Sequence, residues 1–168
     1  MKIIMDQDAM KRSMVRMAHE IIESNRGLER VVLLGIETRG ATIAFRLAKI
    51  LKEIEGIDVP VASLDVSYWR DDLKTDGEAF RLPISVQDRN VILIDDVLFK
   101  GRTARAAMDG IVYNGRPRRI QLAVLVDRGH RELPIRADFV GKNIPTSLTE
   151  DVRVKLVEDD NDEAVILY

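Results

Sequence analysis

The sequence predicts an α/β fold in which a mostly parallel sheet carries helices on both faces. Two apolar segments, Val31–Leu34 and Val91–Ile94, have no polar break, and a third, Ile120–Val126, has only Gln121; such runs are typical of strands buried on both faces. Helical patterns separate them, and such alternation favours parallel strands joined by helical crossovers. A chain of 168 residues that is 46% hydrophobic suffices for one core. We therefore expect residues 1–168 to form a single domain.

The first half of the chain contains two amphipathic helices. The first is expected to start at a cap on Asp8 and to end near Gly27. Its apolar positions follow the i, i+4, i+7, i+11 spacing of one helix face: Met10, Met14, Met17 and Ile21. The second helix is expected from Ala41 to Glu55, where Gly56 stops it. The apolar face of the first helix and the free strand edges also favour self-association.

The second half is less regular. We expect a strand over Val59–Val66, a polar stretch from Trp69 to Arg81, and an edge or hairpin strand over Leu82–Val86. A helix should follow from Thr103 to Asn114. After Arg128 the chain is rich in Gly and Pro as far as Pro145, and two short strands are then expected: Val152–Val157 and Ala164–Tyr168.

Composition excludes several classes of protein. There is no cysteine, which rules out disulfides, thiolate catalysis and cysteine-bound metals. The N-terminus lacks the apolar run of a signal peptide, and no segment approaches the ~20 apolar residues of a membrane span. We expect a soluble, cytoplasmic protein.

Charge is distributed unevenly although the net charge is only −2. Residues 158–163 carry five acids and no base, whereas residues 116–142 carry seven bases and three acids. The basic segment is compatible with a phosphate or polyanion partner. Charge alone favours the alternative of a solvated, salt-bridged surface.

Two adjacent acids, Asp95 and Asp96, end the central apolar strand, and a Lys-Gly-Arg-Thr loop opens the next helix. Free backbone N–H groups and the positive end of a helix at such a turn can hold a phosphate, while the carboxylates hold hydroxyls or a metal. A sugar phosphate suits both halves. Two other interpretations are a pair of solvated acids that cap a helix and a response-regulator-like phosphoacceptor, although the Gly-Arg-Thr loop argues against the latter.

A second phosphate site is predicted at Gly35–Gly40. The turn has the glycine spacing of a nucleotide P-loop, but Ala41 stands where that loop requires lysine, and the chain has no GxGxxG. ATP and dinucleotide binding in the usual modes are therefore disfavoured. A short phosphate nest remains, with the backbone N–H groups of Thr38 to Gly40 and the side chain of Arg39 as donors. In a parallel sheet this turn and the acidic pair both follow the carboxyl ends of their strands, so they lie at the same end of the sheet.

Residues 91–103 resemble the 5-phosphoribosyl-1-pyrophosphate (PRPP) signature of the type I phosphoribosyltransferases. The resemblance implies the type I fold, with a small hood built from the N- and C-terminal segments. It also implies that Asp95 and Asp96 hold the ribose hydroxyls and that the loop binds the 5′-phosphate. The segment that carries these roles continues with Val97, Leu98, Phe99, Lys100, Gly101, Arg102 and Thr103.

The same resemblance implies further roles. Thr38 and Arg39 match the pyrophosphate loop, and Arg70 and Arg81 are candidate clamps on a closing loop. Base-side contacts are expected from Arg128 and from the backbone around Val152, whereas His130 is more typical of a surface or phosphate contact than of a general base. The candidate catalytic residues are Asp95, Asp96, Arg39 and Arg70. Mg²⁺ is expected to arrive with PRPP, and no dedicated protein metal ligand is predicted.

Nearly the whole chain resembles one branch of this family, the bifunctional attenuation regulators of pyrimidine operons that are also uracil phosphoribosyltransferases. Residues 125–138 are the most distinctive part of the match. The resemblance implies that uracil and PRPP form UMP and diphosphate, that pyr mRNA is bound in a UMP-dependent manner to promote transcription attenuation, and that the protein forms a homodimer or a higher homo-oligomer. Basic side chains suited to RNA are Lys11, Arg12, Arg16, His19, Arg116, Arg118, Arg119, Arg136 and Lys142.

Four positions depart from the family pattern. Lys100 replaces a threonine, Glu37 replaces a residue that is usually basic, Val15 replaces a hydroxyl residue, and the loop between Leu73 and Leu82 is short. A cation of different shape at the 5′-phosphate and an acid beside the pyrophosphate nest predict slow UMP synthesis. Two alternatives stay open: a salvage phosphoribosyltransferase for another base, and a catalytically silent nucleotide sensor that binds RNA.

Overall fold

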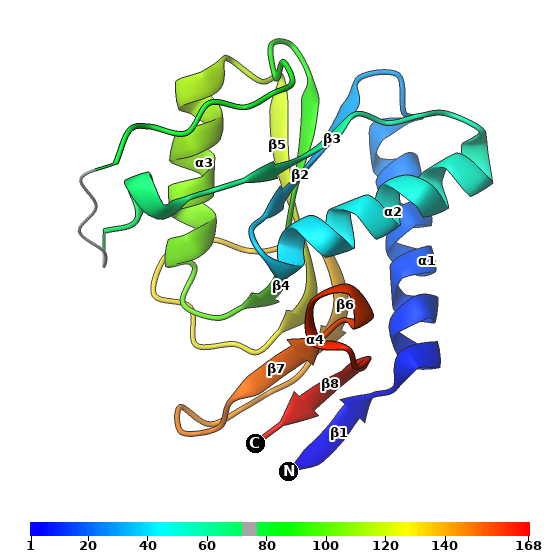
Figure 1. The fold of residues 1–168 in the computed structure, drawn as a ribbon, viewed down its shortest axis with the longest axis vertical. Helices are drawn as coiled ribbons and strands as arrows, with labels where there is room; N and C mark the ends of the chain where they lie inside the picture. The colour runs from blue at the N-terminus through cyan, green and yellow to red at the C-terminus, as the bar shows by residue number, and fades with distance from the viewer. Residues whose placement is uncertain (72–76) are drawn as a thin grey trace.

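Five parallel strands form the centre of the molecule in a computed structural model that describes residues 1–71 and 77–168 (Figure 1). Their order across the sheet is β3 (Val61–Leu64), β2 (Val31–Ile36), β4 (Asn90–Leu98), β5 (Arg119–Asp127) and β6 (Phe139–Asn143). The most apolar strands, β2, β4 and β5, lie in the middle. This placement follows from their composition, because only central strands are covered on both faces.

Helices cover the two faces of this sheet. Packed on one face are α1 (Gln7–Asn25) and α2 (Arg39–Glu55), and α3 (Arg102–Asn114) lies on the other. Alternate residues of each strand enter the two cores: Ile92 and Ile94 face α1 and α2, whereas Leu93 faces α3. A 3₁₀ turn, η1 (Ser67–Trp69), packs beside α3.

A small antiparallel sheet forms a hood. It has the order β1 (Lys2–Met5), β8 (Ala164–Leu167) and β7 (Val152–Lys155), so the two ends of the chain lie side by side (Figure 1). A single helical turn, α4 (Val157–Asp160), connects β7 to β8. The hood lies next to the carboxyl end of β4, where Val152 and Asp96 line the same hollow.

The predicted architecture of a mostly parallel sheet, helices on both faces and a hood from both chain ends is confirmed. Some local predictions were wrong. The cap of α1 is Asp6, whose Oδ1 accepts a hydrogen bond from the Ala9 N–H at 2.8 Å, and Asp8 lies inside the first turn. Either acid could cap the helix by composition. Asp6 does so because its backbone is extended, as the capping position requires.

Residues 82–86 do not form the predicted strand. Their backbone is irregular, and the Leu82 N–H donates to the side chain of Asn114 at 2.8 Å instead of to a neighbouring strand. Leu82 and Ile84 still bury part of their side chains in the α3 core. The alternating pattern therefore reflects a loop that lies on the core.

Two strands, β1 and β6, were not predicted. The β6 strand has no apolar run, and it pairs closely with β5 because Gly141 has no side chain: a Cβ there would lie 2.5 Å from the Leu125 carbonyl oxygen. The apolar face of α1 is fully buried against the sheet, so it is not available for the self-association that it was expected to support. Across the described residues, no helix has the length and apolarity needed to cross a membrane.

Candidate active site

The acidic pair lies at the carboxyl end of β4, and its two side chains serve neighbouring hollows. Asp95 lines a hollow of about 170 Å³ together with the loop that precedes α3. Asp96 lines a hollow of about 270 Å³ together with Arg39 and Val152 of the hood. Adjacent residues of a strand point to opposite sides, which explains the division. Asp95 thus faces the N-terminus of α3, and Asp96 faces the hood. We call this end of the sheet, where the parallel strands end, its carboxyl edge, and the opposite end its amino edge.

Asp95 has an unusual electrostatic environment. Burial raises the pKa of this carboxyl well above its usual range, the nearby charge of Asp96 adds to the rise, and the positive charge of Arg70 opposes it. The Asp96 N–H also donates to Asp95 Oδ1 at 2.9 Å. A carboxyl that retains its proton can donate as well as accept hydrogen bonds, which suits the hydroxyls of a sugar.

The loop from Lys100 to Thr103 forms an anion-binding turn. Gly101 is the N-cap of α3 with φ +93°, a conformation that side chains rarely adopt. Since the first N–H groups of a helix have no partner within it, those of α3 are available to a phosphate. The geometry therefore supports the predicted 5′-phosphate role of this loop.

Cations surround this loop, and each contacts a neighbour. Arg70 donates from Nη1 to Thr103 Oγ1 at 3.1 Å, which places it over the loop. Arg102 instead pairs with Asp71 at 2.6 Å and with Glu132 at 3.1 Å, and these carboxylates raise the pKa of Arg102. The ammonium of Lys100 lies 5.6 Å from the Phe99 ring centroid.

The second predicted phosphate turn, residues 35–40, lies beside the acids because two glycines permit it. A Cβ on Gly35 would lie 2.4 Å from the Ala41 Cα, and a Cβ on Gly40 would lie 2.6 Å from the Ile94 carbonyl oxygen. Any side chain at either position would push the start of α2 away from β4. The Glu37–Thr38 peptide bond in this turn is cis.

Arg39, the predicted pyrophosphate ligand, is held by the hood. Its guanidinium donates two hydrogen bonds to the carboxylate of Asp160, at 3.1 and 2.5 Å. This bidentate contact raises the pKa of Arg39 and lowers that of Asp160. A diphosphate that approached Arg39 would have to take the place of the Asp160 carboxylate.

The acidic run of residues 158–163 contributes further contacts of this kind between the hood and α2. Arg46 pairs with Glu158 and, at 2.5 Å, with Glu163, and Thr42 donates to Asp159 at 2.7 Å. The pKa of Glu158 is lowered by its bond to Arg46. The acids that appear unpaired in the sequence therefore attach the hood to the helix that carries Arg39.

Arg128, predicted to contact the nucleobase, contacts neighbouring parts of the protein. Its side chain is 3% exposed and stacks 3.8 Å from the Phe99 ring centroid. It also donates to the carbonyl oxygens of Ser147 at 3.1 Å and Glu150 at 2.7 Å. Arg128 thus fixes Phe99 and the loop before β7, and Val152 lies directly after that loop.

Arg81, unlike His130 and Glu37, lies away from this edge. Arg81 contacts Tyr113, at the opposite end of α3 from the phosphate loop. The segment predicted to close over PRPP includes residues 72–76, which lie outside the described part of the chain. His130 lies near Phe99, with 6.2 Å between the ring centroids. Glu37 accepts a hydrogen bond from Ser63 at 3.1 Å.

The predicted RNA-binding residues fall into several groups. Arg12, Arg16 and Lys142 line one hollow of about 300 Å³ between α1 and β6, where Arg16 donates to the carbonyl oxygens of Val140 and Gly141. Lys11 lies in a different groove, toward α2. Arg118 and Arg119 line a hollow at the amino edge of the sheet. The remaining members are exposed: His19, Arg116 and Arg136.

Sequence reasoning missed the carboxylates that hold the cations of the site. Asp160, Asp71 and Glu132 are distant in sequence from the arginines they contact. The run of acids at residues 158–163 was the only signal of any of these pairs, and it does not identify its partner.

Comparison with known proteins assigns the chain to a class. The family model for the phosphoribosyl transferase domain matches residues 1–160. The chain belongs to this family of phosphoribosyltransferases. More particularly, it belongs among the PyrR proteins: it is 55% identical to the bifunctional protein PyrR of Streptococcus mutans, covering 99% of this chain and 94% of that protein. It is likewise 57% identical to the bifunctional protein PyrR of Chloroflexus aurantiacus, with the same coverage.

Solved structures show the same fold. The hypoxanthine phosphoribosyltransferase of Trypanosoma cruzi superimposes with a TM-score of 0.78 at 17% identity, over 99% of this chain and 95% of that one. A phosphoribosyltransferase of Leishmania tarentolae in complex with GMP superimposes with a TM-score of 0.73 at 17% identity, over 99% and 96% of the two chains. At these identities the comparison establishes the fold alone.

Proposed function

We propose that this protein is a regulator of pyrimidine biosynthesis that binds pyr mRNA in a UMP-dependent manner and also converts uracil and PRPP into UMP and diphosphate. The observation that carries the proposal is the 55% identity to a bifunctional PyrR protein over nearly the full length of both chains. The acidic pair and the glycine turn meet at one edge of the sheet, which supports the enzymatic half.

In the proposed reaction, uracil attacks ribose C1 as diphosphate leaves. The carboxyls of Asp95 and Asp96 hold the ribose hydroxyls, and the N–H groups of the loop around Gly101 hold the 5′-phosphate. Arg39 and Arg70 face the charge that builds on the leaving diphosphate. Catalysis then depends on positioning and electrostatic stabilisation, with no covalent intermediate on the protein.

Mg²⁺ is the metal expected with PRPP. The described residues hold no group of three or more acidic, histidine or cysteine side chains that could bind a metal alone. A metal carried by the diphosphate of the substrate fits such a site, because Mg²⁺ keeps several waters and takes few protein ligands. Asp95 and Asp96 offer the hard oxygen atoms it prefers, and the bound metal would neutralise part of the diphosphate charge.

The regulatory half requires a basic surface. Arg12, Arg16 and Lys142 offer three cations in one hollow of the α1–β6 seam, and His19 is exposed further along the same helix. Single-stranded RNA loops bind to such surfaces through their phosphates and their unstacked bases. UMP at the carboxyl edge would then favour the form of the protein that binds RNA.

Residues 1–168 act in this proposal as one domain, because side-chain contacts from α2 attach the hood to the sheet. A homodimer or a higher homo-oligomer is part of the proposal. Large apolar side chains that are exposed in the isolated chain, among them Phe45 and Val112, support it.

The proposal is tested by assays of both halves. We expect uracil with PRPP and Mg²⁺ to yield UMP, at a slow rate, and hypoxanthine or guanine to yield no nucleotide. Nucleotide formed only from a purine base would identify a salvage enzyme instead.

A pyr-leader hairpin should bind in a filter assay more tightly with UMP than without it. UMP-dependent RNA binding with no turnover would identify a silent sensor, and no preference over unrelated RNA would exclude the regulatory half.

A further inference from the structure

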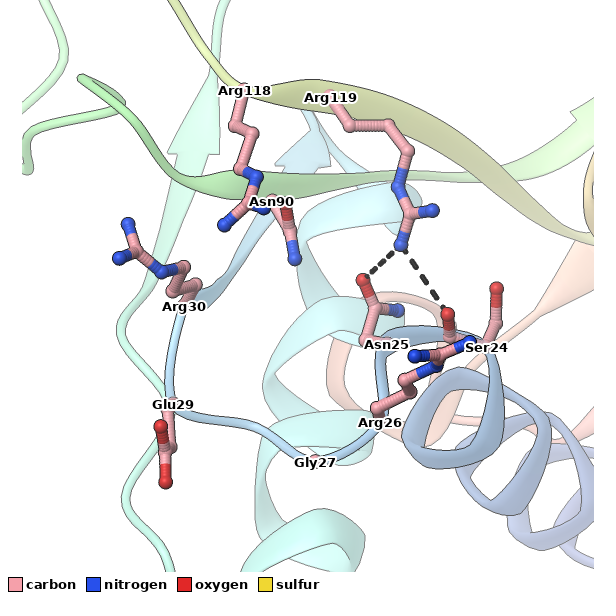
Figure 2. A pocket seen from close by; sticks show the side chains of 9 residues that line it. All are labelled: Ser24, Asn25, Arg26, Gly27, Glu29, Arg30, Asn90, Arg118 and Arg119. Atoms are coloured by element: carbon pink, nitrogen blue, oxygen red, sulfur yellow. Dashed lines mark hydrogen bonds between the residues drawn. The ribbon is translucent and has the colours of Figure 1, made fainter.

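Arginines surround a hollow at the amino edge of the parallel sheet, the opposite edge from the proposed nucleotide site (Figure 2). Its volume is about 500 Å³, larger than either hollow at the acidic pair. The end of α1, the turn before β2, and the first residues of β4 and β5 form its walls. The four cations that line it are Arg26, Arg30, Arg118 and Arg119.

These arginines differ in what they contact. Arg119 donates to the Ser24 carbonyl oxygen and, at 2.7 Å, to Asn25 Oδ1, so it joins β5 to the end of α1. Among the described residues, the side chains of Arg26 and Arg118 form no hydrogen bond or ion pair. Among the described residues, Glu29 is the only acid that lines the hollow, and Figure 2 shows its carboxylate pointing away from the arginines. Four arginines and one carboxylate give the described lining a net positive charge.

The lining chemistry selects phosphate groups over bases. A guanidinium offers paired donors that match phosphate oxygens. Asn90 and Asn25 add amide groups, and the described part of the chain contributes no aromatic or large apolar side chain to the lining. Unpaired bases bind by stacking on such side chains, so this lining favours phosphates.

The position of the hollow connects it to the other basic group on α1. Arg16 contacts β6 midway along α1, and Ser24 lies at its end, where Gln121 and Arg119 of β5 contact it. At 1.5 Å per residue these two positions are separated by about 12 Å along the helix. A single RNA strand can span that distance with a few nucleotides, so one strand can contact both basic groups.

We propose that this arginine hollow is a second phosphate-binding site, separate from the nucleotide site, and that it binds consecutive phosphates of the RNA strand. The identity of the ligand depends on the proposed RNA-binding function, whereas the phosphate chemistry depends only on the hollow. Arg26 and Arg118 are the ligand-binding residues, and Arg119 positions β5 against α1.

The salt dependence of RNA binding tests this site. In Arg26→Ala/Arg118→Ala, the slope of log K against log salt should fall by about 1.4, at about 0.7 for each lost phosphate contact to a single strand. The affinity for UMP, measured by calorimetry, should not change. Arg26→Lys/Arg118→Lys should keep most of the slope because it keeps the charge. Lys49→Ala/Lys52→Ala, which removes two cations from α2, should match the wild type.

An unchanged slope in a folded Arg26→Ala/Arg118→Ala variant would overturn the proposal. If the wild-type protein binds UMP but no RNA, the proposed RNA-binding function is wrong. The affinity for inorganic tripolyphosphate then tests whether the hollow binds phosphate at all. A loss of tripolyphosphate affinity in Arg26→Ala/Arg118→Ala but not in Lys49→Ala/Lys52→Ala would retain a phosphate site with another ligand. Equal tripolyphosphate affinity in the two variants would exclude it.

Discussion

Arginines lie at both ends of the parallel strands, at the carboxyl edge and at the amino edge of the sheet. Two arginines from each edge differ in whether a carboxylate of the protein is paired with them. At the carboxyl edge, Arg39 and Arg102 are already paired with carboxylates. At the amino edge, Arg26 and Arg118 line a hollow with no partner among the described residues. A ligand at the carboxyl edge must therefore exchange with an internal acid, whereas a ligand at the amino edge meets a free cation. Exposed ion pairs are worth only ~0.2–1 kcal/mol, so a phosphate that forms several charge-assisted bonds can displace one.

The largest effect is expected from the acidic pair, because Asp95 and Asp96 define the proposed ligand site at the carboxyl edge. In Asp95→Asn/Asp96→Asn, PRPP affinity should fall by at least ~30-fold, because a lost hydrogen bond to a charged carboxylate costs about 1.5–3 kcal/mol and one to a carboxyl that keeps its proton, as expected for Asp95, costs about 0.5–1.5 kcal/mol. RNA binding through the amino-edge hollow should keep its salt slope. Calorimetry with PRPP and Mg²⁺ measures the first effect, with Asp109→Asn, an exposed acid of α3, as the control. Unchanged PRPP affinity in a well-folded double variant would refute the assignment of the carboxyl edge.

A smaller effect is expected at the phosphate loop. Lys100 is a long cation beside Phe99, and the family resemblance of residues 91–103 predicts a threonine at its position. Lys100→Thr restores a short hydroxyl donor and should raise kcat/KM for UMP synthesis about tenfold, equivalent to ~1.4 kcal/mol. A uracil and PRPP assay measures it, and Lys52→Thr on α2 serves as the control. A fall in kcat/KM would show that the charge of Lys100 contributes to phosphate binding.

The exchange between Asp160 and a ligand can be measured directly. Asp160→Asn keeps an oxygen for the Leu156 N–H but removes the charge that holds Arg39. PRPP should then bind at least ~2–5-fold more tightly, because the Arg39–Asp160 ion pair no longer competes: exposed pairs are worth ~0.2–1 kcal/mol, and this one is partly buried. Asp159→Asn, which alters the contact with Thr42, is the matched control. Weaker PRPP binding in Asp160→Asn would mean that Asp160 positions Arg39 for the ligand.

The smallest expected effect concerns stability and pH. Since the pKa of Asp95 is raised in the folded protein, the folded state holds more protons than the unfolded state above pH ~4. Stability should fall as the pH rises from there toward the raised pKa. Asp95→Asn removes this loss, and its Tm at neutral pH should exceed that of the wild type by ~2–4 °C for each kcal/mol recovered. Thermal unfolding from pH 4 to pH 8 tests this, and parallel curves for the two proteins would contradict it.

The sequence predicted those parts of the fold and the site that are formed by residues close together in the chain, and it did not predict several contacts between distant segments. The strand, acids, loop and helix of residues 91–114 were predictable because each feature lies next to the one it acts with. The strand β6 was not, because its pairing with β5 depends on the absence of a side chain at Gly141. The Arg39–Asp160 contact was not predictable either, since it joins residues 121 positions apart. The amino-edge hollow likewise combines segments that only the fold brings together.

The pairing of β1 with β8 has a consequence for the order of folding. Lys2 lies opposite Leu167 and Ile3 opposite Ile166, so β1 gains its neighbouring strand only after β8 has been synthesised. Because β8 also lies between β1 and β7, the small sheet that holds Val152 beside Asp96 is complete only at that stage. The proposed nucleotide site therefore depends on β1 and β8 together, and changes in either strand act on the same wall of the site.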